Sequence, residues 1–204
     1  MSRFTGPRVK VMRALGLELP GLSRKSIERR PYPPGEHGGR RRRRDSVFGL
    51  QLKEKQKLKM NYGVSEKQMR RLIKQARRSK QETGLKLIEL LERRLDNVVF
   101  RAGYAPTIPA ARQLVNHGHF RVNGRKVDVP SFCVGEGDII ELKPKSAKLK
   151  PVEEALEQLS LTRPEWVTFD AEARKTTVQG LPASDSVPFE IDVQQVVEYY
   201  ARRL

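Results

Sequence analysis

One stretch near the middle of the chain, residues 107–130, restricts the possible folds more than any other. It reads TIPAARQLVNHGHFRVNGRKVDVP. Thr107 can cap a short helix over 108–116, which His117-Gly118 then ends. Asn123-Gly124 lies between two strand-like runs and favours a two-residue hairpin turn, because that turn needs positive φ at both positions. The stretch therefore predicts a helix followed at once by an antiparallel hairpin.

The elements on either side of this stretch complete an α+β pattern. Ser65 and Gln68 show the spacing of a capping box at the start of one helix. Apolar periodicity and end signals place the other elements. They are helices over 47–62, 66–79 and 83–103, strands within 138–143, 165–170 and 174–180, a short helix after Pro151 and a final helix after Asp192.

The helix predicted over 83–103 carries two different stripes. An apolar stripe at helical spacing is expected in the core: Leu91, Leu95, Val98 and Ala102. A polar stripe is either a solvated face or a binding face: Arg94, Asn97 and Arg101.

Positive charge is distributed unevenly along the chain, whose formal net charge is +17. Residues 1–44 contribute +10 and residues 45–150 contribute +12, whereas residues 151–204 contribute −5. Such an excess must lie on surfaces or tails, and a polyanion is its natural partner. The acidic last quarter is consistent with a separate face for a protein.

The same counts separate residues 1–44 as a basic N-terminal extension. This segment contains a run of five arginines and is expected to become ordered on nucleic acid.

Motifs for other chemistry are missing from the sequence. There is no P-loop, no G-x-S-x-G and no G-x-G-x-x-G, so no catalytic residue is predicted. His117 and His119 lack the cysteine or histidine partners of a zinc site, and no metal or cofactor is predicted. The single cysteine, Cys133, is expected to be a small buried residue. No apolar run is long enough to span a bilayer, and the start of the chain lacks a secretory signal, which predicts a cytoplasmic protein.

The spacing of polar and cationic residues instead predicts an RNA-binding ridge across the helix and the hairpin. Arginine suits phosphate oxygens, while asparagine and histidine can bind phosphate, ribose hydroxyls or bases. RNA is favoured over DNA because no recognition helix with a dimerisation element is visible. The predicted RNA-binding residues are Arg94, Asn97, Arg101, Arg112, Gln113, Asn116, His117, His119, Arg121, Asn123, Arg125 and Lys126, with Arg40, Arg41, Arg42, Arg43 and Arg44 from the extension.

Several stretches resemble one family of ribosomal proteins. The stretch LLERRLDNVVFRAGYAPTIPAARQLVNHGHFRVNGRKVDVPSFCVGEGDIIEL is similar to the RNA-binding module named after the fourth protein of the small subunit. SRFTGPRVKVMRALG, RRPYPPGEHG, LKEKQKLKMNYGVSEKQMRRL and VVEYYARR resemble that ribosomal protein itself, so the resemblance covers nearly the whole chain.

The resemblance implies a helical domain of residues 45–91 together with 185–204. That domain would hold an inserted RNA-binding domain, residues 92–184, with two helices, a β-hairpin and further antiparallel strands. The resemblance also implies a primary binder of small-subunit ribosomal RNA that binds a multi-helix junction, nucleates assembly of the subunit body and contributes to translational accuracy. It implies contact with small-subunit proteins five and twelve. It also implies a location in bacterial-type ribosomes in the cytoplasm, and no enzymatic activity. Many members bind zinc through four cysteines near the N-terminus. This chain has none there and resembles the zinc-free form.

Two other functions compete with this interpretation. The same module also occurs in RNA-modifying enzymes, so conversion of uridine by the purified chain would favour an enzyme. A free RNA chaperone or a DNA-compacting protein would bind random duplex DNA as well as it binds the ribosomal RNA junction.

Overall fold

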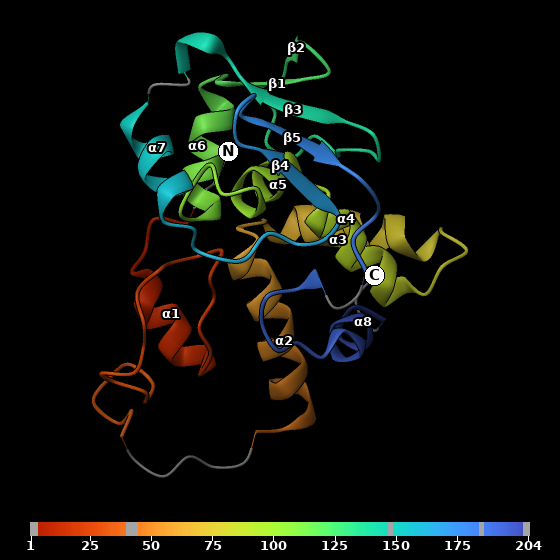
Figure 1. Ribbon diagram of the computed structural model, residues 1–204. Coiled ribbons are helices and arrows are strands. Elements are labelled where there is room, and N and C mark those ends of the chain that lie inside the picture. The colour runs from red at the N-terminus through yellow and green to blue at the C-terminus, as the bar shows by residue number, and fades with distance from the viewer. Residues whose placement is uncertain (1–3, 40–44, 147–148, 184–185, 202–204) are drawn as a thin grey trace. The chain divides into compact units, whose positions relative to one another are not determined.

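The computed structural model describes residues 4–39, 45–146, 149–183 and 186–201. They form two compact units (Figure 1). The first unit combines the chain up to Leu87 with the chain from Val187 onward, and the second unit consists of residues 88–186. The predicted boundaries were 91/92 and 184/185. Helices and a five-stranded antiparallel sheet confirm the predicted α+β class.

The first unit is helical. Its elements are α1 (Arg8–Leu15), α2 (Val47–Asn61), α3 (Glu66–Arg77), the first part of α4 (Thr83–Glu92) and α8 (Val193–Ala201). The Ser65 hydroxyl accepts from the Gln68 amide, and the Gln68 side chain accepts from the Ser65 amide, which confirms the capping box. Both bonds satisfy amides that a helix start leaves without intrahelical partners.

A buried polar contact fastens α8 to α3. The Tyr200 hydroxyl donates to Glu66 Oε1 at 2.6 Å, and Lys55 Nζ of α2 donates to Glu66 Oε2 at 3.1 Å. Lys55 also lies 4.8 Å from the centre of the Tyr199 ring. One carboxylate thus connects three helices of this unit.

The described N-terminal residues contain α1, which the sequence analysis did not predict. Apolar side chains close a small core under it: Met12, Leu19 and Leu22. Arg13 Nε donates to the carbonyl oxygens of Arg30 and Tyr32 at 3.0 Å each. This segment therefore packs as part of the helical unit, while the five-arginine run of residues 40–44 lies outside the described residues.

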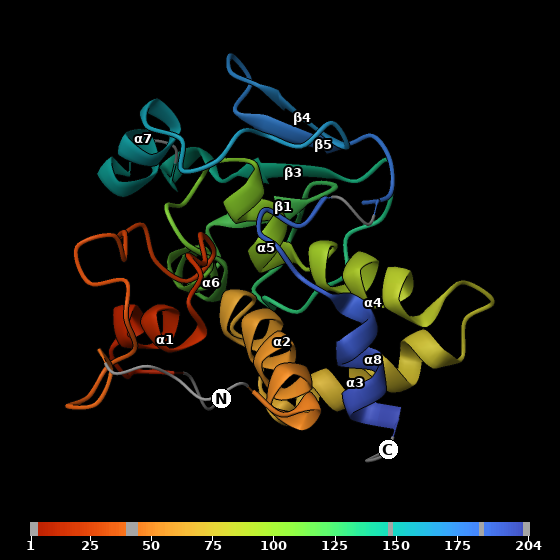
Figure 2. The same ribbon diagram turned by 90° about the horizontal axis from the view of Figure 1, so that it is seen from below.

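The second unit holds the end of α4, three further helices and the sheet. Helices α5 (Leu95–Arg101) and α6 (Ile108–Asn116) lie on one side of the sheet (Figure 2). The strand order is β2-β1-β3-β5-β4 and every pair is antiparallel. The remaining bounds are β1 (Phe120–Val122), β2 (Arg125–Lys126), β3 (Ile139–Leu142), η1 (Pro144–Ser146), α7 (Lys150–Glu157), β4 (Val167–Asp170) and β5 (Lys175–Val178).

The hairpin between β1 and β2 confirms the predicted turn. Asn123 and Gly124 have φ of 49° and 75°, as a type I′ turn requires. The Asn123 side chain accepts from the Ile139 amide at 2.9 Å and donates to Asp138 at 2.7 Å, so it also fixes the turn to the start of β3.

The predicted helix over 83–103 is wrong as one continuous element. It breaks at Arg94, whose ψ of 136° is extended, and α5 starts afresh at Leu95. The loop before β3 accounts for the break, because carbonyls of Pro130 and Phe132 accept from the amides of Asp96 and Leu95. The new helix start obtains its acceptors from a segment distant in sequence, which local periodicity does not report.

The apolar stripe is buried as predicted, and it faces the core of this unit. Leu91, Leu95, Val98 and Ala102 are all 0% exposed. Tyr104 packs edge-on between Phe120 and Phe169, which joins the helix–loop segment to the sheet. No helix within the described ranges has the length and apolarity to cross a membrane. Cys133 is exposed, so the expectation of a buried thiol is wrong.

Candidate nucleic-acid interface

Part of the predicted RNA-binding ridge lies inside the second unit. Arg94, Asn97 and Arg101 are all buried, so the expectation of a solvent-facing polar stripe is wrong. Asp96 is fully buried, and Arg94 donates to it through Nε at 3.0 Å and Nη2 at 2.8 Å. The Arg94 side chain is therefore committed to a buried ion pair that supports the start of α5.

Glu92 provides a second buried partner. Asn97 Nδ2 donates to the backbone oxygen and to Oε2 of Glu92, both at 2.9 Å. Arg101 Nε lies 3.5 Å from Glu92 Oε2, and its Nη2 donates to the Ser186 carbonyl at 2.7 Å. Glu92 thus supplies the counter-charge for the buried Arg101, although Arg101 Nε makes no hydrogen bond itself.

Arg112 lies at the edge of this buried network. Its Nε and Nη2 donate to Asp96 Oδ2 at 3.0 and 2.6 Å, and its side chain is 20% exposed. The sequence analysis placed this arginine on the RNA-binding ridge. Asp96 orients it instead, which fixes the guanidinium at the boundary between the core and solvent.

The remaining predicted residues of the module lie at the surface, where α6 passes into the hairpin. We call this the junction surface and define it by His117, His119, Arg121, Arg125 and Lys126. Arg121 lies opposite Lys126 in the antiparallel register of β1 and β2. Gln113 and Asn116 are exposed on the last turns of α6, and Asn123 is exposed in the turn that it stabilises.

The electrostatic environment of His119 is positive. Its Nδ1 is hydrogen-bonded to Ser146 Oγ at 2.9 Å, and its ring centre lies 6.0 Å from that of His117. Partial burial, followed by the charges of His117 and Lys143, lowers the pKa of His119. Sequence reasoning missed Lys143, which pairing of β1 with β3 brings beside the histidine: the Lys143 amide donates to the His119 carbonyl at 2.9 Å.

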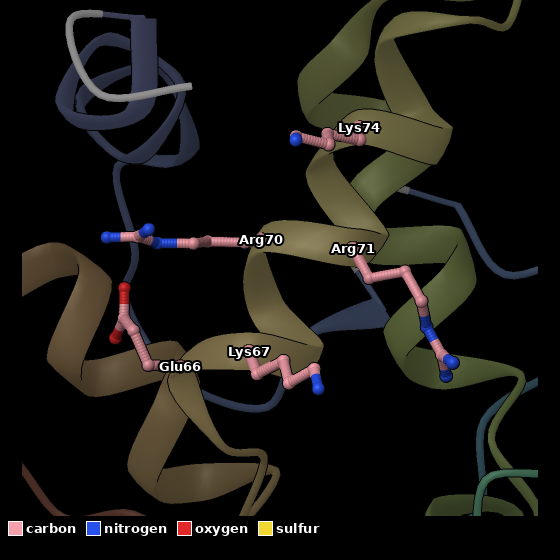
Figure 3. A pocket seen from close by; sticks show the side chains of 5 residues that line it. All are labelled: Glu66, Lys67, Arg70, Arg71 and Lys74. Atoms are coloured by element: carbon pink, nitrogen blue, oxygen red, sulfur yellow. The ribbon is translucent and has the colours of Figure 1, made fainter.

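A second cationic surface lies on α3 in the helical unit. Its cations are exposed: Lys67, Arg70, Arg71, Lys74 and Arg77. Figure 3 shows Lys67 and Arg71 extending to one side of the helix and Arg70 to the other, around a hollow that Glu66 also lines. The sequence analysis noted these charges on the outer faces of the helix but did not include them among the site residues.

The one acid of α3 is occupied by partners within the unit. Partial burial favours a higher pKa for Glu66, but hydrogen bonds from Tyr200 and Lys55 and the charges of Lys55 and Lys59 outweigh it and lower the pKa. Glu66 therefore stays ionised and bound to other helices. The outer faces of α3 retain a strong excess of positive charge, which suits a polyanion.

Within the described ranges, no three His, Cys, Asp or Glu side chains are grouped so that they could hold a metal ion. The junction surface is built from arginine, lysine and histidine side chains, and the α3 surface is built from arginine and lysine side chains. These groups can bind phosphate and ribose.

Comparison with known proteins gives consistent matches along the whole chain. The family described as "Ribosomal protein S4/S9 N-terminal domain" matches residues 3–92, and the family described as "S4 domain" matches residues 93–140. The chain is 62% identical to the small ribosomal subunit protein uS4 of Methylobacillus flagellatus and 58% identical to uS4B of Nitrosomonas europaea. It is 49% identical to uS4 of Synechococcus elongatus, and each of these three alignments covers 100% of both chains.

Proposed function

Because this chain belongs to the ribosomal protein S4 family, we propose that it is a structural constituent of the small ribosomal subunit that binds ribosomal RNA. The observation that carries the proposal is full-length identity of 62% to a protein named as a small-subunit constituent. The positive charge on an outer surface of each unit fits that role.

RNA binding follows from the distribution of cations. The junction surface and the α3 surface replace counterions around RNA phosphates, and release of those counterions favours the complex. The buried pairs of Asp96 and Glu92 contribute indirectly, since they hold α5 and α6 in place and orient Arg112 at the edge of the junction surface. Affinity will therefore fall steeply with salt.

We further propose that the RNA is a junction at which several helices of small-subunit RNA meet. Each of the two units carries its own cationic surface, and two linked surfaces gain effective concentration when both meet segments of one folded RNA. This bivalent attachment would let the protein nucleate assembly of the subunit body. The five-arginine run at 40–44 adds cations to the same task.

The proposed protein partners are the neighbouring small-subunit proteins five and twelve, and contact with them would contribute to translational accuracy. Acidic side chains are exposed on the outer part of the second unit, including Glu157 on α7 and Asp170 and Glu172 beside the β4–β5 turn. Exposed carboxylates such as these repel RNA phosphates and suit a basic protein. We expect the protein to work in the cytoplasm, within ribosomes.

The test compares binding of the purified chain to small-subunit RNA containing the junction with binding to random duplex DNA, over a series of salt concentrations. We expect RNA binding to be stronger by at least about 10³-fold at physiological salt, as is typical of specific recognition. Equal affinity for both would favour a chaperone or a DNA-compacting protein. The family is not an enzyme family, and the absence of uridine conversion in the same samples would support a purely binding role.

A further inference from the structure

Gly118 occupies an unusual place on the junction surface, between the two histidines. It is buried and has a φ of 69°, and its amide donates to the Val115 carbonyl at 2.8 Å to end α6. A Cβ atom at this position would lie 2.5 Å from Lys126 Cε, 3.3 Å from Lys126 Nζ and 3.7 Å from Lys143 Nζ. The missing side chain leaves room into which two lysines extend.

Sheet pairing brings these lysines together from opposite sides of β1. Lys126 lies on β2, in register with Arg121 of β1. Lys143 follows β3, whose Leu142 is in register with Phe120 of β1. The two ammonium groups thus lie within 4 Å of one point above Gly118, with His119 next to it along β1.

The two ammonium groups near Gly118 have little compensating negative charge around them. Among the described residues, Lys143 has no ion pair, and Glu141 on the same strand lies 3.5 Å from Lys175 instead. Lys126 Nζ lies 3.1 Å from Asp128, but both side chains are more than half exposed, so water competes with that pair. Two ammonium groups and two histidines therefore crowd together with one exposed acid nearby.

We propose that Gly118, His119, Lys126 and Lys143 form a binding site for one phosphodiester group of the RNA backbone. The inference rests on the proposed function, since RNA supplies the phosphate. Lysines bind phosphate as point charges, and an anion between them relieves their mutual repulsion. Ser146 holds His119 through Nδ1, which leaves Nε2 as the ring nitrogen for the ligand.

Glycine is required at the floor of the site for two reasons. Its positive φ is costly for any other residue except asparagine or aspartate. A methyl group there would also displace the Lys126 stem and occupy the space above the backbone. Glycine therefore lets the Lys126 stem lie over the main chain, where its ammonium group and that of Lys143 can share one phosphate.

Occupation of the site has a consequence for His119. The groups around its ring are His117 just after α6, Lys143 just after β3, and Ser146 from η1. The two charged neighbours disfavour protonation of the ring, whereas a bound phosphate favours it. RNA binding should therefore be accompanied by uptake of a proton, at a pH between the lowered pKa of the free His119 ring and its higher pKa in the complex.

The decisive variants are Lys143→Met, which removes the charge and keeps most of the stem, and Lys143→Arg, which keeps the charge. Lys145→Met is the matched control, because Lys145 is an exposed neighbour on η1 that does not reach Gly118. Affinity for small-subunit RNA is measured against salt concentration. One lost phosphate contact should lower the slope of log K against log salt by about 0.7–0.9 and weaken binding several-fold.

We expect this change for Lys143→Met and a near wild-type slope for Lys143→Arg and Lys145→Met. The pKa of His119, followed by NMR of its ring protons, should rise when RNA is added to the wild type. The same shift with inorganic phosphate alone would indicate that the site also takes the free anion, which supports the assignment of phosphate chemistry.

Two outcomes would overturn the site. One is a Lys143→Met slope and affinity equal to those of Lys145→Met, and the other is a His119 pKa that RNA does not raise. Either result, obtained while the wild type still prefers ribosomal RNA over duplex DNA, rejects the site and leaves the proposed function intact. Loss of that preference in the wild type itself would reject the proposed function instead.

Discussion

Replacing Asp96 with asparagine should destabilise the unit of residues 88–186 strongly, although the two side chains have nearly the same shape. Asp96 is 0% exposed and accepts four hydrogen bonds from two guanidinium groups, at 2.6 to 3.0 Å. The substitution removes the negative charge and turns one of its acceptor oxygens into a donor. It leaves Arg94, whose side chain is 6% exposed, as a buried cation without a counter-charge.

The magnitude follows from the environments of the two arginines. Removing one partner of a buried ion pair costs about 3–5 kcal/mol. Arg94 would remain a buried cation, whereas Arg112 is 20% exposed and can turn toward water. Because only one of the two cations stays buried, we expect a cost at the lower end of this range, about 3 kcal/mol. For a unit of this size that loss should lower the unfolding temperature by at least about 10 °C.

Trp166 makes the assay specific to this unit. It is the chain's single tryptophan, lies within residues 88–186 and is 8% exposed, so its fluorescence reports on unfolding of this unit in denaturant. Asp128→Asn is the matched control, because Asp128 pairs with Lys126 at an exposed position where such a pair contributes less than about 1 kcal/mol. An Asp96→Asn midpoint no lower than that of the control would refute the role assigned to the buried pair.

Three further variants probe other parts of the chain. Gly103→Ala should destabilise the second unit by about 1–3 kcal/mol in the same fluorescence assay, since φ is +96° and a Cβ would lie 2.4 Å from a leucine methyl carbon. Replacing Lys67, Arg71 and Lys74 together with glutamine should lower the salt slope of RNA binding by about 2–3 without changing the unfolding midpoint, and an unchanged slope would remove α3 from the interface. Glu66→Gln tests a pH effect: the folded pKa of Glu66 is lowered, so its stabilisation is present above the unfolded pKa of about 4.3 and is lost as pH falls through the folded pKa. The stability gap between wild type and Glu66→Gln should therefore narrow on acidification in circular dichroism melts, and a constant gap would contradict the assignment.

Elements defined by local rules could be predicted from the sequence. The Ser65–Gln68 capping box and the Asn123-Gly124 turn depend on backbone angles and hydrogen bonds within four residues, and both form as expected. The apolar stripe that ends at Ala102 was also predicted correctly, because apolar residues at helical spacing are buried whatever they pack against.

The polar stripe was misjudged because its partners could not be identified from spacing. Arg94, Asn97 and Arg101 share a helical face in sequence, which is typical of a solvated surface. Burial became possible only because the carboxylates of Glu92 and Asp96 are buried with them. The break at Arg94 was invisible for a related reason, since the acceptors for the new helix start come from a loop more than 30 residues later.

The sequence by itself determined the class of partner and the local architecture. A net charge of +17, concentrated before residue 151, requires a polyanion, and the order of caps and turns requires an α+β chain. Tertiary structure decided which cations are available to a partner. It withdrew Arg94 and Arg101 into ion pairs, and it brought Lys143 beside Lys126 across β1. The physical reason is that a charge has no fixed role along the chain: its role depends on whether the fold places a counter-charge, water or another cation within a few ångströms.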